Sequence, residues 1–306
     1  MTQSITLLDG GLGQELILRS RREKPHPAWS LKVMQEEPSL VSDTHHDFCA
    51  AGARVIGTNS YVITRARLRK HATEDELEAY LDHAISLART GIAASTSPYA
   101  TSVVASLPPL VASYVAAVAP DFEQAYREYS ELIELQKKKV DAFMLETMSN
   151  IAEASAGARA LHEQKVVGVI GFTVDDDDGT KLRSGESLAE AVASVAEYRP
   201  DAILINCSRP EVVSAGLEII KSTGIRFGAY ANGFAAVEAL RPGGTVDSLA
   251  ARTDLGPEAY AAHVMEWVDM GASIVGGCCE VGPEHIRYLH DQLLASGYEL
   301  NHSLAA

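Results

Sequence analysis

Eight short apolar runs, separated by longer amphipathic stretches, constrain the fold of this chain more than any other feature. Runs of this kind are typical of buried parallel strands, and the stretches between them are long enough to form crossover helices. Eight strands that alternate with helices predict an α/β fold, a single (β/α)8 TIM barrel. The expected strands are residues 5–8, 54–57, 101–106, 142–145, 166–172, 202–205, 226–230 and 273–275.

Proline and glycine mark the ends of the intervening segments. Pro38 and Pro257 stand where a helix begins, and Gly52 and Gly271 follow helical stretches, where a left-handed residue is favoured. The 306 residues contain no internal repeat and no Ser/Gly-rich linker, so we expect one domain over residues 1–306. The expected helices are residues 38–51, 75–95, 121–139, 150–162, 187–198, 211–221 and 257–270.

The charge balance disfavours two classes of partner. Asp and Glu number 41 against 26 Lys and Arg, which gives a formal net charge of −15. Nucleic acids and anionic membranes require clustered basic residues, so we expect neither as a partner. The first residues do not resemble a secretory leader, and no apolar run reaches the ~18 residues of a membrane span. The sequence therefore predicts a soluble, cytoplasmic protein.

Polar and sulfur-bearing residues follow several of the predicted strands. In a (β/α)8 barrel the segments after the strands meet on one face, where active sites form. A carboxylate that ends an apolar strand needs a partner, so Glu146 is a candidate site residue by position alone. Asp9, taken alone, is better explained as a turn residue beside Gly10 and Gly11.

Three of the four cysteines also fall at strand ends, Cys207 after the sixth strand and Cys278-Cys279 after the eighth. A barrel brings these ends together, and three thiolates favour zinc with one tetrahedral position open. Two glycines before Cys278 give the backbone the freedom that adjacent ligands need. The alternatives are three small core residues, or a phosphate loop at the glycines. We expect Cys49 in the core rather than as a ligand.

Together these residues resemble the homocysteine S-methyltransferases, a family of zinc-dependent barrel enzymes. The resemblance covers nearly the whole chain, and its most specific part is Asn206-Cys207 followed by Gly276-Gly277-Cys278-Cys279. Further matching segments are Asp9-Gly-Gly-Leu-Gly-Gln-Glu-Leu, Ala51-Gly-Ala-Arg-Val-Ile-Gly-Thr-Asn-Ser-Tyr61 and Leu145-Glu146-Thr147.

The resemblance implies a role for each candidate residue. Cys207, Cys278 and Cys279 would hold Zn2+, and the thiol of L-homocysteine would take the open position. Asp9 and Glu146 would bind the ammonium group of homocysteine, and backbone N–H groups around Gly10 and Gly11 would receive its carboxylate. Asn206 precedes a ligand and joins the substrate-binding candidates, although strand alternation could turn it away. Thr58 and Asn59 could line the pocket floor or cap a loop, whereas Tyr61 favours core packing.

The methyl donor is the least determined part of this interpretation. The family often carries Gly-Pro after the third strand, where this chain has Pro108-Pro109. The chain shows no cobalamin or folate module and no long C-terminal extension, so we expect S-methylmethionine or S-adenosylmethionine as the small-molecule donor. The alternatives are betaine as donor, selenocysteine or another thiol as acceptor, a zinc hydrolase, and a non-enzymatic zinc or redox sensor. The sequence leaves the oligomeric state open.

Two other polar clusters are expected to face solvent. The acidic run Asp175–Asp178 lacks the alternating spacing of a calcium loop, and could at most attract a cationic donor. His45 and His46, between Asp43 and Asp47, fit an exposed helix face rather than a metal site.

Overall fold

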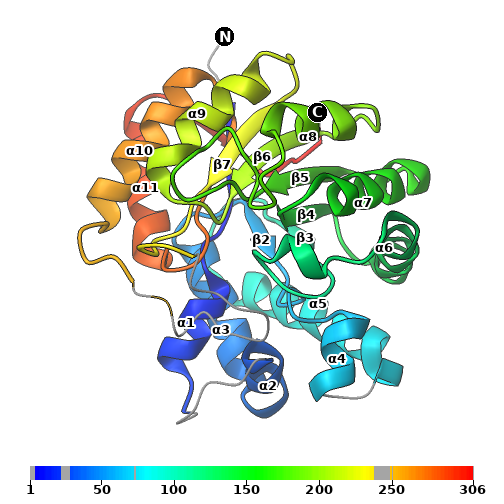
Figure 1. Cartoon of the computed structure of the whole chain (residues 1–306). Coiled ribbons are helices and arrows are strands. Elements are labelled where there is room, and N and C mark those ends of the chain that lie inside the picture. Colours follow the sequence, from blue (N-terminus) through cyan, green and yellow to red (C-terminus); the bar gives the residue numbers. More distant parts are fainter. Residues whose placement is uncertain (1–3, 22–27, 72–73, 238–248, 250, 306) are drawn as a thin grey trace.

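The centre of the molecule is a curled, all-parallel sheet of nine strands, with helices packed outside it (Figure 1). This computed structural model describes the chain except residues 1–3, 22–27, 72–73, 238–248, 250 and 306. The strand order is β2-β3-β4-β5-β6-β7-β8-β1-β9. The strands are β1 (Ser4–Leu7), β2 (Val55–Gly57), β3 (Ser102–Leu107), β4 (Ala142–Met148), β5 (Gly168–Phe172), β6 (Ala202–Asn206), β7 (Phe227–Tyr230), β8 (Ile274–Val275) and β9 (Glu299–Asn301).

The helices follow the strands along the chain and cover the outer face of the sheet. All seven predicted helices are present, and no helix among the described residues is both long and apolar enough to cross a membrane. The helices are α1 (Leu12–Arg19), α2 (Trp29–Glu36), α3 (Pro38–Ala50), α4 (Arg65–His71), α5 (Leu77–Ala94), α6 (Phe122–Gln136), α7 (Ile151–Gln164), α8 (Leu188–Ala196), α9 (Pro210–Lys221), α10 (Pro257–Met270) and α11 (Pro283–Ala295), with short 3-10 turns η1 (Glu74–Glu76) and η2 (Ala116–Val118).

All eight predicted strands are confirmed, but the sheet differs from the predicted barrel in two ways. A ninth strand, β9, pairs with the start of β1, and its three residues carry no apolar run that would have predicted it. The ladder is open between β2 and β9, although Leu8 forms one parallel bridge with Val55 and the Asp9 amide donates to the Val55 carbonyl at 3.0 Å. The observed fold is therefore a curled nine-stranded sheet with a single-bridge seam.

Strand alternation divides the buried side chains between the two faces of the sheet. On β6, Ala202 and Leu204 join the cluster inside the curl, whereas Ile203 and Ile205 pack against the helices. The same alternation on β4 puts Ala142 and Met144 inside and leads to Glu146 at the carboxyl end. The inner face of the curled sheet is thus apolar along most of its strands and polar at their carboxyl ends.

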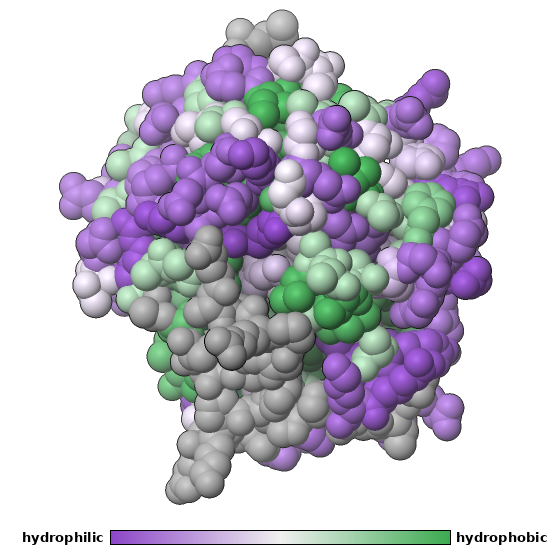
Figure 2. All heavy atoms as spheres, in the orientation of Figure 1, coloured by the Kyte–Doolittle hydropathy of each residue, from purple (hydrophilic) through white to green (hydrophobic). Residues whose placement is uncertain are grey.

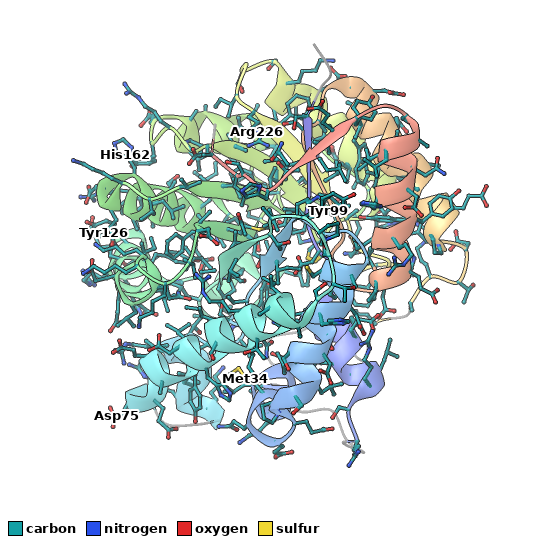
Figure 3. All side chains as sticks on the ribbon, turned by 180° about the vertical axis from the view of Figure 1, so that it is seen from behind. Met34, Asp75, Tyr99, Tyr126, His162 and Arg226 are labelled. Carbon is teal, nitrogen blue, oxygen red and sulfur yellow. A yellow bond between two sulfur atoms is a disulfide. The ribbon has the colours of Figure 1, made fainter. Side chains whose placement is uncertain are left out.

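The C-terminal segment covers the amino ends of the strands. The Leu304 side chain is only 3% exposed and lies in the inner cluster. Arg226 donates to the carbonyls of Ser303 and Ala305 and to the Thr6 hydroxyl, on the rear side of the molecule (Figure 3). Because this end is covered, a ligand reaches the inside of the sheet from the carboxyl end.

Candidate metal and substrate site

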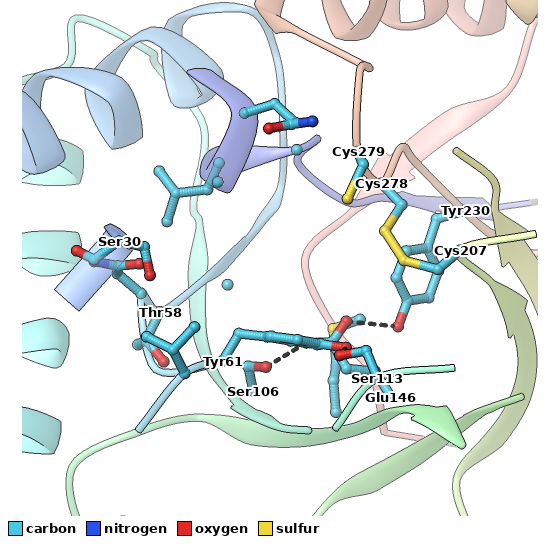
Figure 4. A pocket seen from close by; sticks show the side chains of 18 of the residues that line it. Ser30, Thr58, Tyr61, Ser106, Ser113, Glu146, Cys207, Tyr230, Cys278 and Cys279 are labelled. Carbon is cyan, nitrogen blue, oxygen red and sulfur yellow. Dashed lines mark hydrogen bonds between the residues drawn. A yellow bond between two sulfur atoms is a disulfide. The ribbon is translucent and has the colours of Figure 1, made fainter. Parts of the chain in front are cut away.

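A cavity of about 430 Å³ opens at the carboxyl ends of the strands (Figure 4). Every predicted site residue except Asn206 lies on its wall. These residues are Asp9, Gly10, Gly11, Glu146, Cys207, Cys278 and Cys279. The structure therefore brings together the carboxyl end of β4 and the segments that follow β1, β6 and β8, as the sequence predicted.

The three cysteine sulfurs form one cluster, all within 4.8 Å of one another. Cys207 has a φ of 46°, and this left-handed backbone accounts for its place on the inner wall, because regular alternation after Ile205 would point it outward. The structure joins Cys207 and Cys278 in a disulfide, whereas Cys279 is a free thiol. The structure thus shows the cluster with one disulfide, and the assignment of all three cysteines as metal ligands stays a prediction for the reduced protein.

The cluster fits a tetrahedral zinc ion once the disulfide is reduced. Zn–S bonds of ~2.3 Å at tetrahedral angles separate ligand sulfurs by ~3.8 Å, which lies within the 4.8 Å that encloses the three sulfurs. Cys49 is buried in the core beside Thr101, as expected, and does not belong to the cluster. Three sulfur ligands leave the fourth position of the ion to face the cavity.

Glu146 is held by two hydroxyl groups. The Ser106 hydroxyl donates to one carboxylate oxygen, and the Tyr230 hydroxyl donates to the other at 3.1 Å (Figure 4). Burial raises the pKa of Glu146, and these hydrogen bonds oppose that shift. Neither hydroxyl was predicted, although Ser106 and Tyr230 are the polar residues that end the apolar runs of β3 and β7.

Asp9 faces the same space as Glu146. Its Oδ2 accepts the Gly57 N–H at 2.8 Å, while burial and then the nearby Glu146 raise its pKa to about 8. Neither carboxylate forms an ion pair with any described residue. Two neighbouring carboxylates without a cation are costly to ionise together, so the arrangement fits a cationic ligand.

Gly10 and Gly11 pack directly against the cysteine turn. A Cβ on Gly10 would lie 2.0 Å from the Val281 carbonyl oxygen, and one on Gly11 would lie 2.5 Å from that of Cys278. The Gly11 amide donates to Val281, whereas the Gly10 amide has no acceptor among the described residues. Of the two predicted carboxylate-binding amides, only that of Gly10 is thus available to a ligand.

Asn206 lies behind the cavity wall and is fully buried. Its Oδ1 accepts the Thr147 N–H at 2.9 Å, and its Nδ2 donates to the Thr147 hydroxyl at 2.9 Å. Thr147 follows Glu146 and has a φ of 63°, so these bonds fix the backbone that carries the carboxylate. The structure does not bring Asn206 to a substrate, because both ends of its amide are already paired.

The remaining wall comes largely from α2, α4 and the segments after β2 and β3. Thr58 and Asn59 lie on this wall, where Asn59 donates to the Ser30 carbonyl at 3.0 Å. Tyr61 packs against the hydrophobic core, as expected, and also lines the cavity, with its hydroxyl 2.7 Å from that of Ser113. The sequence analysis missed Trp29, Arg67, Tyr114 and Val118. Figure 2 shows hydrophobic side chains near the middle of this face, where the segment after β3 lies in Figure 1.

Two expected solvent-facing clusters are partly buried. His45 is fully buried, because α5 packs on this face of α3 and a Cβ on Gly91 would lie 2.8 Å from that of His45. In the acidic run, Asp177 is exposed, but the Asp176 carboxylate pairs with buried Arg183 at 2.7 Å. The run of four aspartates therefore did not show in the sequence that Asp176 forms a buried ion pair with Arg183.

The fold and the cavity define an α/β enzyme whose site combines three cysteines with two carboxylates. Residues 6–293 match the model of one protein family, described as homocysteine S-methyltransferase. The chain belongs to the homocysteine S-methyltransferase family, as the sequence motifs indicated.

Relatives in plants and bacteria are similar over nearly their whole length. Homocysteine S-methyltransferase 2 of Arabidopsis thaliana is 29% identical, with 96% of this chain and 94% of that protein aligned. Selenocysteine Se-methyltransferase of Brassica oleracea is also 29% identical, over 96% and 90%. The crystal structure of the homocysteine methyltransferase MmuM from Escherichia coli in its metallated form has a TM-score of 0.78 at 25% identity, covering 95% of this chain and 96% of that one.

Proposed function

We propose that this protein transfers a methyl group from a sulfonium donor, S-methylmethionine or S-adenosylmethionine, to the thiol of L-homocysteine, which yields methionine. The observation that carries the proposal is one cavity lined by three clustered sulfurs and by the carboxylates of Asp9 and Glu146, neither of which forms an ion pair with a described residue. Family membership supports the reaction class, and the metallated E. coli structure supports a metal at the cysteines.

Cys207, Cys278 and Cys279 would hold one Zn2+ ion in the reduced protein. When bound, zinc lowers the pKa of a coordinated thiol, which favours the nucleophilic thiolate at neutral pH. A cytoplasmic location belongs to the same proposal, because a reducing compartment keeps the Cys207–Cys278 disulfide open. We also propose that the sheet forms a complete (β/α)8 barrel, and the Leu8–Val55 bridge between β1 and β2 supports this.

The chain's own residues would position the acceptor. Asp9 and Glu146 would bind the ammonium group of homocysteine, while Ser106 and Tyr230 fix the Glu146 carboxylate. The Gly10 amide would donate to the substrate carboxylate. Asn206 would act only through the backbone beside Glu146.

Methyl transfer needs no general base at the carbon that moves. The sulfur of homocysteine forms the new C–S bond as the C–S bond to the donor's positive sulfur breaks, so the donor leaves as a neutral thioether. The thiol proton leaves to solvent when homocysteine binds. The remaining requirement is in-line alignment of the two sulfurs, which the cavity supplies through positioning and exclusion of water.

A selenol acceptor is a second candidate, favoured by the similarity to the Brassica selenocysteine Se-methyltransferase. A selenol would use the same sulfur-lined site. Selenocysteine is one methylene shorter than homocysteine, so its ammonium group would lie differently relative to Asp9 and Glu146. Competition between the two acceptors in one assay distinguishes the candidates by their ratio of kcat/KM.

The decisive experiment measures methionine formation by reduced, zinc-loaded protein supplied with L-homocysteine and one donor at a time. The donors are S-methylmethionine, S-adenosylmethionine and betaine. We expect turnover with at least one sulfonium donor and none with betaine. Protein that holds about one zinc per chain, yet forms no methionine or methylated selenocysteine with any donor, would contradict the proposal.

A further inference from the structure

We propose that Arg67 binds a carboxylate group of the methyl donor and thereby orients the donor in the cavity; this inference rests on the proposed methyl transfer. Arg67 lies on α4, which follows β2, whereas the cysteines follow β6 and β8. In the strand order, β2 and β3 are separated from β6 and β7 by β4 and β5. The arginine thus lines a different segment of the cavity wall from the cysteines.

Arg67 is a partly buried cation with no carboxylate partner among the residues that the structure describes. Its Nη2 donates to the Pro109 carbonyl at 2.9 Å and contacts the Ser113 hydroxyl at 3.4 Å. Its Nε is buried and has no hydrogen-bond partner, and Arg67 forms no ion pair with the described residues. An unpaired buried charge is unfavourable, whereas a guanidinium beside a cavity is well suited to bind an anion.

Glu153 is the carboxylate that affects Arg67 electrostatically, but it is hydrogen-bonded to other groups. Its Oε1 accepts from the Leu110 amide at 2.8 Å and from the Tyr129 hydroxyl at 3.3 Å. Its other oxygen lies 3.5 Å from Asn150 Nδ2. The charge of Arg67 therefore remains available to a ligand in the cavity.

The surroundings of Arg67 favour a carboxylate attached to a positive methyl donor. Its guanidinium carbon lies 5.3 Å from the centre of the Tyr61 ring, and the Tyr61 hydroxyl meets that of Ser113, which supplies further hydrogen-bond donors. Lys70, on the same helix, also lines the cavity and adds positive charge. An aromatic face next to this anion site suits the positive sulfur of the donor.

This arrangement separates the charges of the two substrates. The ammonium group of the acceptor lies between two carboxylates with its thiol at the cysteines, and the carboxylate of the donor lies at Arg67, so the thiol determines which of the two amino acids takes the cysteine side. Arg67, Tyr61 and the three cysteines line the same cavity, so a donor held at Arg67 shares one enclosed space with the acceptor thiol. Arg67 thus selects for a carboxylate on the donor, which S-methylmethionine, S-adenosylmethionine and betaine all carry, so the expected preference against betaine has to come from other parts of the cavity.

The test compares Arg67→Met with the wild type, using the donor that the wild type accepts and the carboxamide of that donor. We expect the donor KM to rise by roughly 10- to 100-fold, the scale of a lost charged hydrogen bond, with the homocysteine KM unchanged. The carboxamide should be a poor donor for the wild type and equally poor for the variant. Arg67→Lys should restore part of the affinity.

Arg65→Met is the matched control, because Arg65 lies on the same helix, pairs with Glu131 and does not line the cavity. We expect less than a twofold change in donor KM for this variant. Equal losses with the carboxylate and carboxamide donors, or a change in homocysteine KM instead of donor KM, would overturn the proposal and leave Arg67 a support for the Pro109 backbone.

Calorimetric binding of S-methylmethionine without homocysteine provides a readout that does not depend on turnover. Weaker binding by Arg67→Met than by the wild type supports the inference. The same measurement is made with S-adenosylmethionine where that is the accepted donor; equal affinity of the two proteins for the accepted donor, or no binding of it by either, overturns the inference. A wild type that binds the donor through Arg67 but never forms methionine would contradict the proposed function alone.

Discussion

Glu146 illustrates, at the scale of single residues, how a carboxylate is prepared for a cationic ligand. Its two oxygens are occupied by the hydroxyls of Ser106 and Tyr230, so the group has a fixed direction before substrate binds. Asp9 stands nearby without a cation partner among the described residues, and their mutual repulsion favours an ammonium group between them.

Glu146→Gln tests this role directly. The amide keeps the shape of the side chain but loses its charge, so homocysteine binding should weaken by about 1.5–3 kcal/mol, the contribution of a charged hydrogen bond. Zinc content should not change, because Glu146 is not a ligand of the cluster. Calorimetry with homocysteine and metal analysis check both points, and exposed Glu218→Gln is the control. Unchanged homocysteine affinity would remove Glu146 from the substrate site.

The three cysteines give a second prediction at this scale. Cys207→Ser, Cys278→Ser and Cys279→Ser should each lower zinc below about one ion per chain and abolish methyl transfer, because two thiolates hold zinc far less tightly than three. Cys49→Ala should retain zinc, since Cys49 lies in the core. Oxidation of the wild type should release zinc and reduction should restore its binding, as measured with a chromogenic chelator. Full zinc retention by any of the three serine variants would exclude that cysteine as a ligand.

The sequence predicted the candidate site well where a residue type has few other uses. Vicinal cysteines and a carboxylate at the end of an apolar strand are both costly unless they serve a function, so Cys278, Cys279 and Glu146 stood out. Arg67 and Tyr230 did not, because a single arginine in a helix or a tyrosine in a strand is ordinary. Only the tertiary fold shows that Arg67 has no carboxylate partner within the described part of the chain.

At the scale of elements, apolar runs located the strands because buried parallel strands need continuous apolar sequence. The runs missed β9, α1 and α2: β9 and α1 have few buried apolar residues, whereas α2 buries Trp29, Leu31, Val33 and Met34 but is only eight residues long. α3 was predicted, but the polar residues 43–47 suggested that this face of the helix is exposed to solvent. The α3–α5 contact is decided by Gly91, whose missing side chain lets the two helices approach closely.

His45, buried at this contact, predicts a pH dependence of stability. Burial lowers the His45 pKa from 6.5 to about 4, and neither ring nitrogen has a hydrogen-bond partner. The unfolded chain therefore binds a proton more tightly than the folded protein does. Above pH 6.5, His45 is neutral in both the folded and the unfolded protein and does not reduce the free energy of unfolding. As the pH falls from 6.5 through about 4, the free energy of unfolding decreases, because the unfolded chain takes up a proton that folded His45 does not bind.

The two pKa values correspond to a total loss of ~3 kcal/mol in the free energy of unfolding. His45→Leu should remove this loss, so its free energy of unfolding should exceed that of the wild type most at pH 4. Urea unfolding at several pH values provides the measurement, with exposed His302→Leu as the control. Parallel pH profiles for wild type and His45→Leu would show that His45 does not titrate in this range.

At the scale of the whole molecule, the site depends on the curl of the sheet. Its ligands follow β1, β4, β6 and β8, and these ends meet only because the sheet bends round until Leu8 reaches Val55. No local pattern predicts this closure, since the β1–β2 seam consists of one bridge and two backbone hydrogen bonds. Packing inside the curl must therefore hold the seam together.

Leu304 offers a test of that packing from the far end of the molecule. It is 3% exposed in the inner cluster, whereas Leu294 on α11 is 42% exposed. Leu304→Ala should lower the free energy of unfolding by about 2–4 kcal/mol, because it leaves a cavity between the strands. Leu294→Ala should change it by less than about 0.5 kcal/mol.

Since Leu304 lies at the amino ends of the strands, the folded variant should keep its homocysteine KM. Urea unfolding and steady-state kinetics separate the two effects, and an unchanged unfolding midpoint would mean that the C-terminal segment does not support the curl.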